Sequence, residues 1–177
     1  MSNINQLIER CKKDDSNAQL LIYNKYYKAM YNSAFRILND RFEAEDIMQE
    51  AFLAAFSKLT TFKGEVAFGS WLKRIVINKS LNQLKKNTRY NDLKIELKNN
   101  YNDTEEEIDY SMINAKQMLS GLNQLKPNYK IILTLNLIEG YDYEEISEIL
   151  NYSNENVRTI ISRAKKKLKQ LLISKIK

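Results

Sequence analysis

Histidine is absent from this chain of 177 residues, and Cys11 is its only cysteine. A single thiol cannot close an internal disulfide, and the missing imidazoles exclude Cys/His zinc sites and histidine-based catalytic triads. The carboxylates of residues 105–107 lie in a polar segment without the surroundings that acid-base catalysis needs, so we interpret them as linker. We therefore expect no metal, no cofactor and no enzyme activity.

Turn-forming residues are also scarce, with four glycines and one proline in the whole chain. The alternation of polar and apolar residues between turn signals that is typical of β-strands is absent. Apolar residues recur instead at intervals of three and four, as they do along one face of an α-helix. The sequence therefore predicts an all-α fold.

Long hydrophobic runs are missing as well. No segment approaches the length of a membrane span, and the N-terminus lacks the apolar core and small-residue cleavage site of a signal peptide. We expect no membrane insertion and a reducing, cytoplasmic setting. A formal net charge of +6 favours a polyanionic partner, and basic residues concentrate in residues 73–89 and 165–177.

The chain is predicted to form two small helical domains joined by a polar linker. Helical patterning marks a first domain at residues 1–88, fades in residues 89–111 and returns at residues 112–177. In the second domain, Pro127 should open a helix and Gly140 should end it. A wide apolar and aromatic stripe in the first domain is predicted to be mostly core: Leu20, Leu21, Tyr23, Tyr26, Tyr27, Met30, Tyr31, Ala34, Phe35 and Leu38.

Residues 141–172 have the pattern of a helix-turn-helix that docks on DNA. Asp142 and Glu145 have the spacing of a capping box, and Asn151 tolerates the left-handed backbone of a tight turn, after which Ser153 or Asn154 can cap the next helix. The polar face of that helix offers donors for guanine edges and phosphates: Arg158, Thr159, Ser162, Arg163 and Lys166. A merely solvated basic face is the alternative, but the capped helix pair favours DNA.

Two further surfaces lie in the first domain. A helix beginning near Glu43 places Asp46, Gln49, Glu50 and Leu53 on one face, which suits a protein partner, although an ordinary solvated face is equally compatible with this periodicity. After a loop at residues 60–65, a second helix combines aromatic and basic residues. Such a surface can stack single-stranded bases at roughly 1–3 kcal/mol each, and core packing of the aromatic rings is the alternative.

These motifs, in this order, resemble regions two and four of bacterial extracytoplasmic-function (ECF) sigma factors of the sigma-70 family. The region-two resemblance rests on residues 44–53 (AEDIMQEAFL), 62–65 (FKGE) and 71–72 (WL) and on Phe68, Arg74, Ile75 and Asn78. The region-four resemblance rests on Gly140 and on residues 143–146 (YEEI), 149–150 (IL), 157–159 (VRT) and 162–164 (SRA). Asn151 replaces the usual turn glycine, and Ser162 is smaller than the residue often found at its position.

The resemblance implies a sigma subunit that binds core RNA polymerase and directs promoter recognition, DNA opening and transcription initiation. Asp46, Gln49, Glu50 and Leu53 would meet the clamp helices of the largest polymerase subunit, and the second domain would lie near the flap. The minus-35 element would be read by the polar face at residues 158–166. The opened minus-10 element would be held by Thr61, Phe62, Lys63, Trp71, Lys73, Arg74, Asn78 and Lys79. An anti-sigma factor is a further implied partner.

Other classes of protein stay open at the level of the residues alone. A helix-turn-helix regulator with a helical sensor domain would bind duplex DNA without polymerase. A helical interaction protein with a solvated basic tail would bind DNA without sequence preference. An enzyme has the least support, because no P-loop or catalytic constellation is visible.

Overall fold

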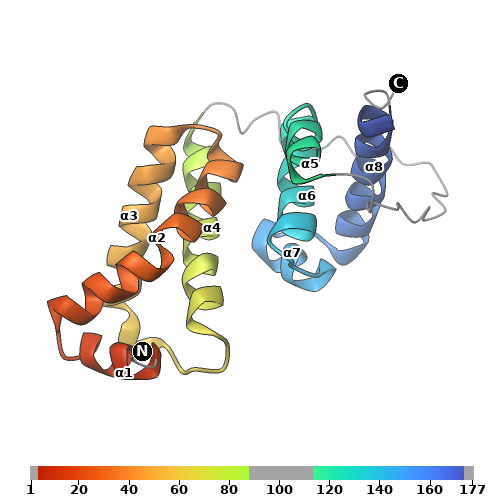
Figure 1. Ribbon diagram of the computed structural model, residues 1–177. Coiled ribbons are helices and arrows are strands. Elements are labelled where there is room, and N and C mark those ends of the chain that lie inside the picture. Colours follow the sequence, from red (N-terminus) through yellow and green to blue (C-terminus); the bar gives the residue numbers. More distant parts are fainter. Residues whose placement is uncertain (1–3, 88–113, 174–177) are drawn as a thin grey trace. The chain divides into compact units, whose positions relative to one another are not determined.

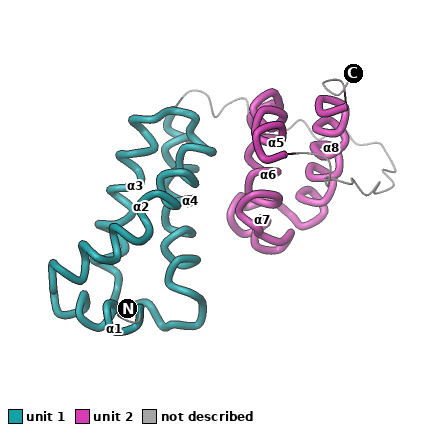
Figure 2. Tube along the Cα trace, in the orientation of Figure 1, with its two compact units in different colours: residues 1–88 teal, residues 89–177 magenta. Residues whose placement is uncertain are grey.

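The computed structural model describes residues 4–87 and 114–173, and these residues form helices without any strand. The all-α prediction is confirmed. The chain divides into two compact units, residues 1–88 and 89–177 (Figure 2). The predicted linker at residues 89–111 lies outside the described residues.

Unit 1 is a bundle of three long helices, each of which packs on the other two (Figure 1). They are α2 (Ser16–Leu38), α3 (Arg41–Ser57) and α4 (Phe68–Lys86). The short helix α1 (Ile4–Cys11) packs against α2, and the 3-10 turn η1 (Leu59–Thr61) follows α3. The fully buried side chains of this core include Ile22, Met30, Leu38, Leu59, Leu72 and Ile77.

Two aspartates fix where α2 and α3 begin. Asp15 accepts hydrogen bonds from the Asn17 and Ala18 amides, and Asp40 accepts from the Phe42 and Glu43 amides at 2.9 and 3.0 Å. These carboxylates satisfy N–H groups that have no partner within the helix. Asn39, in the left-handed conformation at φ 56°, reverses the chain between the two helices, and α3 starts slightly earlier than the sequence pattern predicts.

The predicted core stripe of α2 is too wide. Leu20 and Leu21 are 56% and 48% exposed, which corrects their assignment to the core. The aromatic members of the stripe are only half-buried. The fully buried positions of α2 are smaller or aliphatic side chains, such as Ala18, Ile22 and Ala34, and the half-buried tyrosine rings lie at the margin of this face.

Unit 2 is built around its last helix, which packs against three others (Figure 1). Its elements are α5 (Ala115–Leu122), α6 (Pro127–Leu133), the π-helical segment η3 (Thr134–Ile138), α7 (Tyr143–Leu150) and α8 (Asn154–Ile173). Pro127 occupies the first turn of α6, and Gly140 follows η3 at φ 79°, as the sequence predicts. The core includes Ile132, Leu133, Leu135, Ile146, Ile161 and Leu168.

Gly121 lets α5 approach α8 closely. A Cβ atom at this position would lie 2.8 Å from Leu168 Cδ1 and 3.0 Å from Leu172 Cδ2, which is closer than carbon atoms normally pack. Leu168 is fully buried and Leu172 nearly so, which leaves both side chains little room to move. Any side chain at this position would therefore have to displace one or both leucines.

We predict that Gly121→Val lowers the free energy of unfolding of unit 2 by about 2 kcal/mol through overpacking. Ser120→Val is the matched control, because it adds the same β-branched side chain at the exposed neighbouring position. Urea unfolding of the full chain, followed by circular dichroism, measures the difference. Trp71 is the only tryptophan and lies in unit 1, so its fluorescence reports the unfolding of that unit. The urea midpoint measured by this fluorescence should be the same in both variants. Equal stability of the two variants would contradict the tight contact.

Candidate nucleic-acid and partner interfaces

The start of α7 is held by a complete capping box. Asp142 Oδ1 accepts from the Glu145 amide at 2.8 Å, and Glu145 Oε2 accepts from the Asp142 amide at 3.0 Å. Both bonds satisfy donors that the helix itself leaves unpaired. Upstream, the Asn136 side-chain amide donates to the Tyr141 carbonyl at 3.1 Å, so the segment entering α7 is also fixed.

The turn between α7 and α8 is closed by several hydrogen bonds. Asn151 adopts the left-handed conformation at φ 56° and ψ 48°, as predicted. The Ser147 hydroxyl donates to the Tyr152 carbonyl at 2.6 Å, and the Tyr152 amide donates to the Ser147 carbonyl at 3.1 Å. Ser153 Oγ accepts from the Asn156 amide at 3.3 Å, so Ser153 rather than Asn154 caps α8. The angle between the two helices is thereby set locally.

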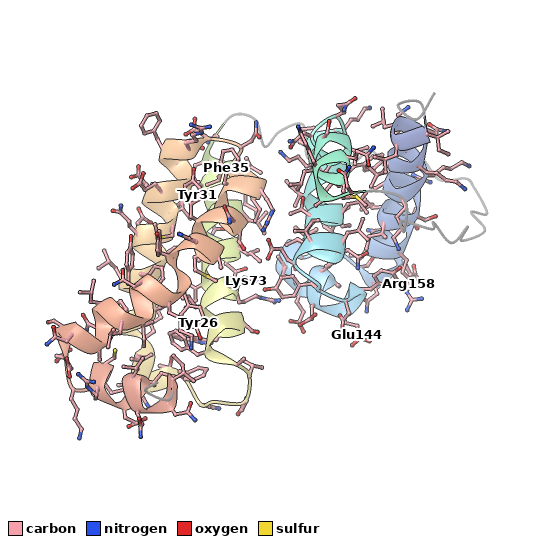
Figure 3. The ribbon with its side chains drawn as sticks, in the orientation of Figure 1. Tyr26, Tyr31, Phe35, Lys73, Glu144 and Arg158 are labelled. Atoms are coloured by element: carbon pink, nitrogen blue, oxygen red, sulfur yellow. The ribbon has the colours of Figure 1, made fainter. Side chains whose placement is uncertain are left out.

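Helix α8 has one buried face and one polar face. Val157, Ile161, Ala164 and Leu168 are buried against the other helices of unit 2. On the polar face, Arg158 and Lys166 are exposed and Thr159, Ser162 and Arg163 are half-buried. Arg158 points outward from unit 2 (Figure 3), and its guanidinium carbon lies 5.5 Å from the centre of the Tyr143 ring. Helices α7 and α8 with their short turn thus form a helix-turn-helix whose second helix has a polar face on the surface of unit 2.

The polar patch predicted on α3 is brought together on one exposed face. Asp46, Gln49, Glu50 and Leu53 are all exposed, and Leu53 is 71% exposed despite its apolar side chain. The opposite face of α3 is buried, which fixes the orientation of the patch. The structure thus places the four side chains of the predicted patch together at the surface.

The loop before α4 is anchored by packed aromatic rings. Phe62 lies 5.1 Å from Trp71 and 5.6 Å from Phe68, and Tyr26 packs on Phe68 from α2 at 5.6 Å, measured between ring centres. Phe62 and Trp71 stay half-buried, whereas Thr61 and Lys63 are exposed. Core packing is thus part of their role, and the remaining ring surface is available to a ligand.

Two family models match this chain, sigma-70 region 2 over residues 22–90 and sigma-70 region 4 over residues 115–168. The chain is also 30% identical to the ECF RNA polymerase sigma-E factor of Haemophilus influenzae, over 90% of its own length and 89% of that relative. It belongs to the ECF group of the sigma-70 family. The RNA polymerase sigma-H factor of Pseudomonas aeruginosa is similar at 30% identity, over 94% of this chain and 92% of that one.

Two solved structures share the fold. CnrH in complex with the cytosolic domain of CnrY matches with a TM-score of 0.56 at 21% identity, over 95% of this chain and 96% of that one. RpoE of Bartonella quintana, in complex with the anti-sigma factor NepR, matches with a TM-score of 0.58 at 20% identity, over 86% of this chain and 94% of that one.

Neither a group of metal-binding side chains nor a membrane-spanning helix is found in residues 4–87 and 114–173. In these ranges no three His, Cys, Asp or Glu side chains gather in a way that could hold a metal ion. None of the helices that they form has the length and apolar character needed to cross a membrane.

The polar residues of α4 that were predicted to contact DNA differ in their exposure to solvent. Asn78 is exposed, and Lys73 and Arg74 are half-buried; Figure 3 labels Lys73 on α4. Lys79 extends to α3, where its Nζ lies 3.0 Å from Glu50 Oε2. A residue expected at DNA and a residue expected at polymerase therefore form an ion pair with each other, which the sequence did not reveal.

Sequence reasoning also missed a groove between α2 and α3. It has a volume of about 560 Å³, and tyrosines that were assigned to the core line one wall. Phe42 borders it and is 83% exposed, one helical turn before Asp46. The repeat of Tyr23, Tyr27 and Tyr31 at four-residue intervals was the available signal, because tyrosine favours positions with one apolar and one wet side.

We predict that the Glu50–Lys79 ion pair contributes about 0.2–1 kcal/mol to the stability of unit 1, since both side chains are substantially exposed. A double-mutant cycle with Glu50→Gln and Lys79→Met, followed by Trp71 fluorescence in urea, measures the coupling. The coupling should shrink as salt rises. A coupling of zero at low salt would contradict this contribution to stability.

Proposed function

We propose that this chain binds core RNA polymerase, directs it to promoters and helps to open the DNA. The observation that carries the proposal is that one chain with both sigma-70 regions exposes a polar patch with a leucine on α3 and a basic helix-turn-helix face on α8. Polymerase would perform the chemistry, and this protein would act by binding and positioning, without enzymatic activity of its own. We infer that it works in the cytoplasm of a bacterium, beside the polymerase.

The patch on α3 is the proposed contact for the clamp helices of the largest polymerase subunit. Asp46 and Glu50 provide negative charge that favours a basic surface on the partner, and Leu53 provides apolar area at its edge. The buried side of α3 fixes the backbone that carries the patch, so little backbone order has to be gained on binding. Unit 2 is proposed to bind near the flap.

The loop before α4 and the basic side of α4 are the proposed site for the opened minus-10 element. Capture of an unstacked base offsets part of the few kcal/mol that strand opening costs per step. Thr61 and Lys63 flank Phe62, whose ring is fixed by Trp71. Lys73, Arg74 and Asn78 are the proposed donors for phosphate and bases, and Lys79, which also pairs with Glu50, is a further one.

The polar face of α8 is the proposed reader of the minus-35 element. Arg158 and Arg163 can donate to guanine edges or to phosphates, and the hydroxyls of Thr159 and Ser162 can bind bases or phosphates. Lys166 can pair with the phosphates of the DNA backbone. The capping box and the closed turn support this role because they present α8 at a fixed angle. An anti-sigma factor is a further proposed partner, and CnrH and RpoE were both solved in complex with a second protein.

Run-off transcription with bacterial core RNA polymerase tests the proposal. We expect the chain to direct initiation from a subset of a promoter library, and Arg158→Ala with Arg163→Ala to abolish this while leaving core binding intact. Each lost phosphate contact should also reduce the salt dependence of binding, whereas a lost base contact should relax specificity at one position. Sequence-specific duplex binding by the chain alone, with no initiation when core is added, would instead identify an ordinary helix-turn-helix regulator.

The contact with polymerase is tested by charge reversal at Asp46. We predict that Asp46→Lys weakens binding to core by about tenfold, or about 1.4 kcal/mol, without destabilising unit 1, since Asp46 is exposed. Asp46 is a cleaner target than Glu50, whose reversal would also place a lysine against Lys79. Glu106→Lys, in the predicted linker, is the control for net charge, and fluorescence anisotropy of the labelled protein gives the affinity. Equal affinities of the two variants for core would exclude the patch on α3 as the polymerase contact.

A further inference from the structure

We propose that Tyr143 is a positioning residue for Arg158, whose guanidinium it holds in one orientation for contact with a single base pair of the minus-35 element. Tyr143 is the first residue of α7, and the guanidinium carbon of Arg158 lies 5.5 Å from the centre of its ring. This inference rests on the proposed role of α8 in DNA recognition and adds a residue of α7 to the determinants of specificity.

The ring contact suits this role because it leaves the hydrogen-bond donors of Arg158 available. A carboxylate partner would occupy the N–H groups that guanine needs, whereas an aromatic ring attracts the cation through its π face. Among the described residues, no carboxylate forms an ion pair with Arg158. Bidentate recognition of guanine O6 and N7 requires these in-plane donors.

The backbone segments that carry Tyr143 and Arg158 are fixed by hydrogen bonds. Tyr143 follows Asp142 directly, and the capping box fixes the backbone on both sides of it at 2.8 and 3.0 Å. Arg158 is carried by α8, whose start is fixed to α7 through the bonds of Ser147 with Tyr152. The backbone that carries the ring and the first turns of α8 therefore keep a constant separation. A long, flexible arginine side chain becomes ordered before DNA arrives, which reduces the entropy lost on binding.

The test measures base preferences at every position of a randomised minus-35 element, with the full chain bound to core RNA polymerase. Arg158→Ala identifies the base pair that Arg158 reads. Tyr143→Leu should reduce discrimination at that same base pair by about two- to fivefold, the range expected for an exposed cation–π contact, and leave other positions unchanged. Tyr143→Phe is the matched control, because it keeps the ring and removes only the hydroxyl; it should retain the wild-type preference.

The outcomes separate this inference from the proposed function. If Arg158→Ala changes no base preference, the assignment of α8 as the reader is wrong. If Arg158→Ala has an effect but Tyr143→Leu has none, only the positioning role is wrong. Equal losses in Tyr143→Phe and Tyr143→Leu would assign the effect to the hydroxyl and also overturn it. In an Arg158→Ala background, Tyr143→Leu should cause no further change in preference. Tyr143→Met replaces Tyr143→Leu if circular dichroism shows that the latter is unfolded.

Discussion

The burial of one face of α8 is the constraint on which unit 2 depends. Val157, Ile161, Ala164 and Leu168 are buried against the neighbouring helices, and Gly121 lets α5 come close to two leucines of α8. With that face fixed, the helix cannot rotate about its axis, so the packing of the core decides which side chains are offered to DNA. The proposed polymerase patch on α3 has the same origin, because its orientation follows from the buried face of that helix.

The features predicted from sequence are those governed by local chemistry. The capping box of Asp142 and Glu145, the left-handed Asn151 and the start of α6 at Pro127 each depend on a few neighbouring residues, and the structure contains all of them. The exposure of Leu20 and Leu21 was predicted wrongly. Periodicity shows that a helix has an apolar side, but the width of its covered surface depends on helices far away in the chain.

The same limit explains the missed contacts. Lys79 and Glu50 are 29 residues apart, and the Tyr143–Arg158 contact spans the turn between two helices, so neither has a spacing that a helical pattern would show. The first of these contacts means that the two surfaces proposed in unit 1 are not electrostatically independent. Any partner that engages Glu50 changes the field at Lys79, although the exposure of the pair keeps this effect small.

Asn151 has a consequence for the unfolded chain. The left-handed turn between α7 and α8 would be free of steric strain with glycine, yet glycine also gives the unfolded polypeptide the largest range of backbone conformations. Asparagine tolerates φ 56° and restricts that range, so less backbone entropy is lost when the turn forms. The stability of the turn thus depends partly on a restriction of the unfolded ensemble, which no contact in the folded protein reveals.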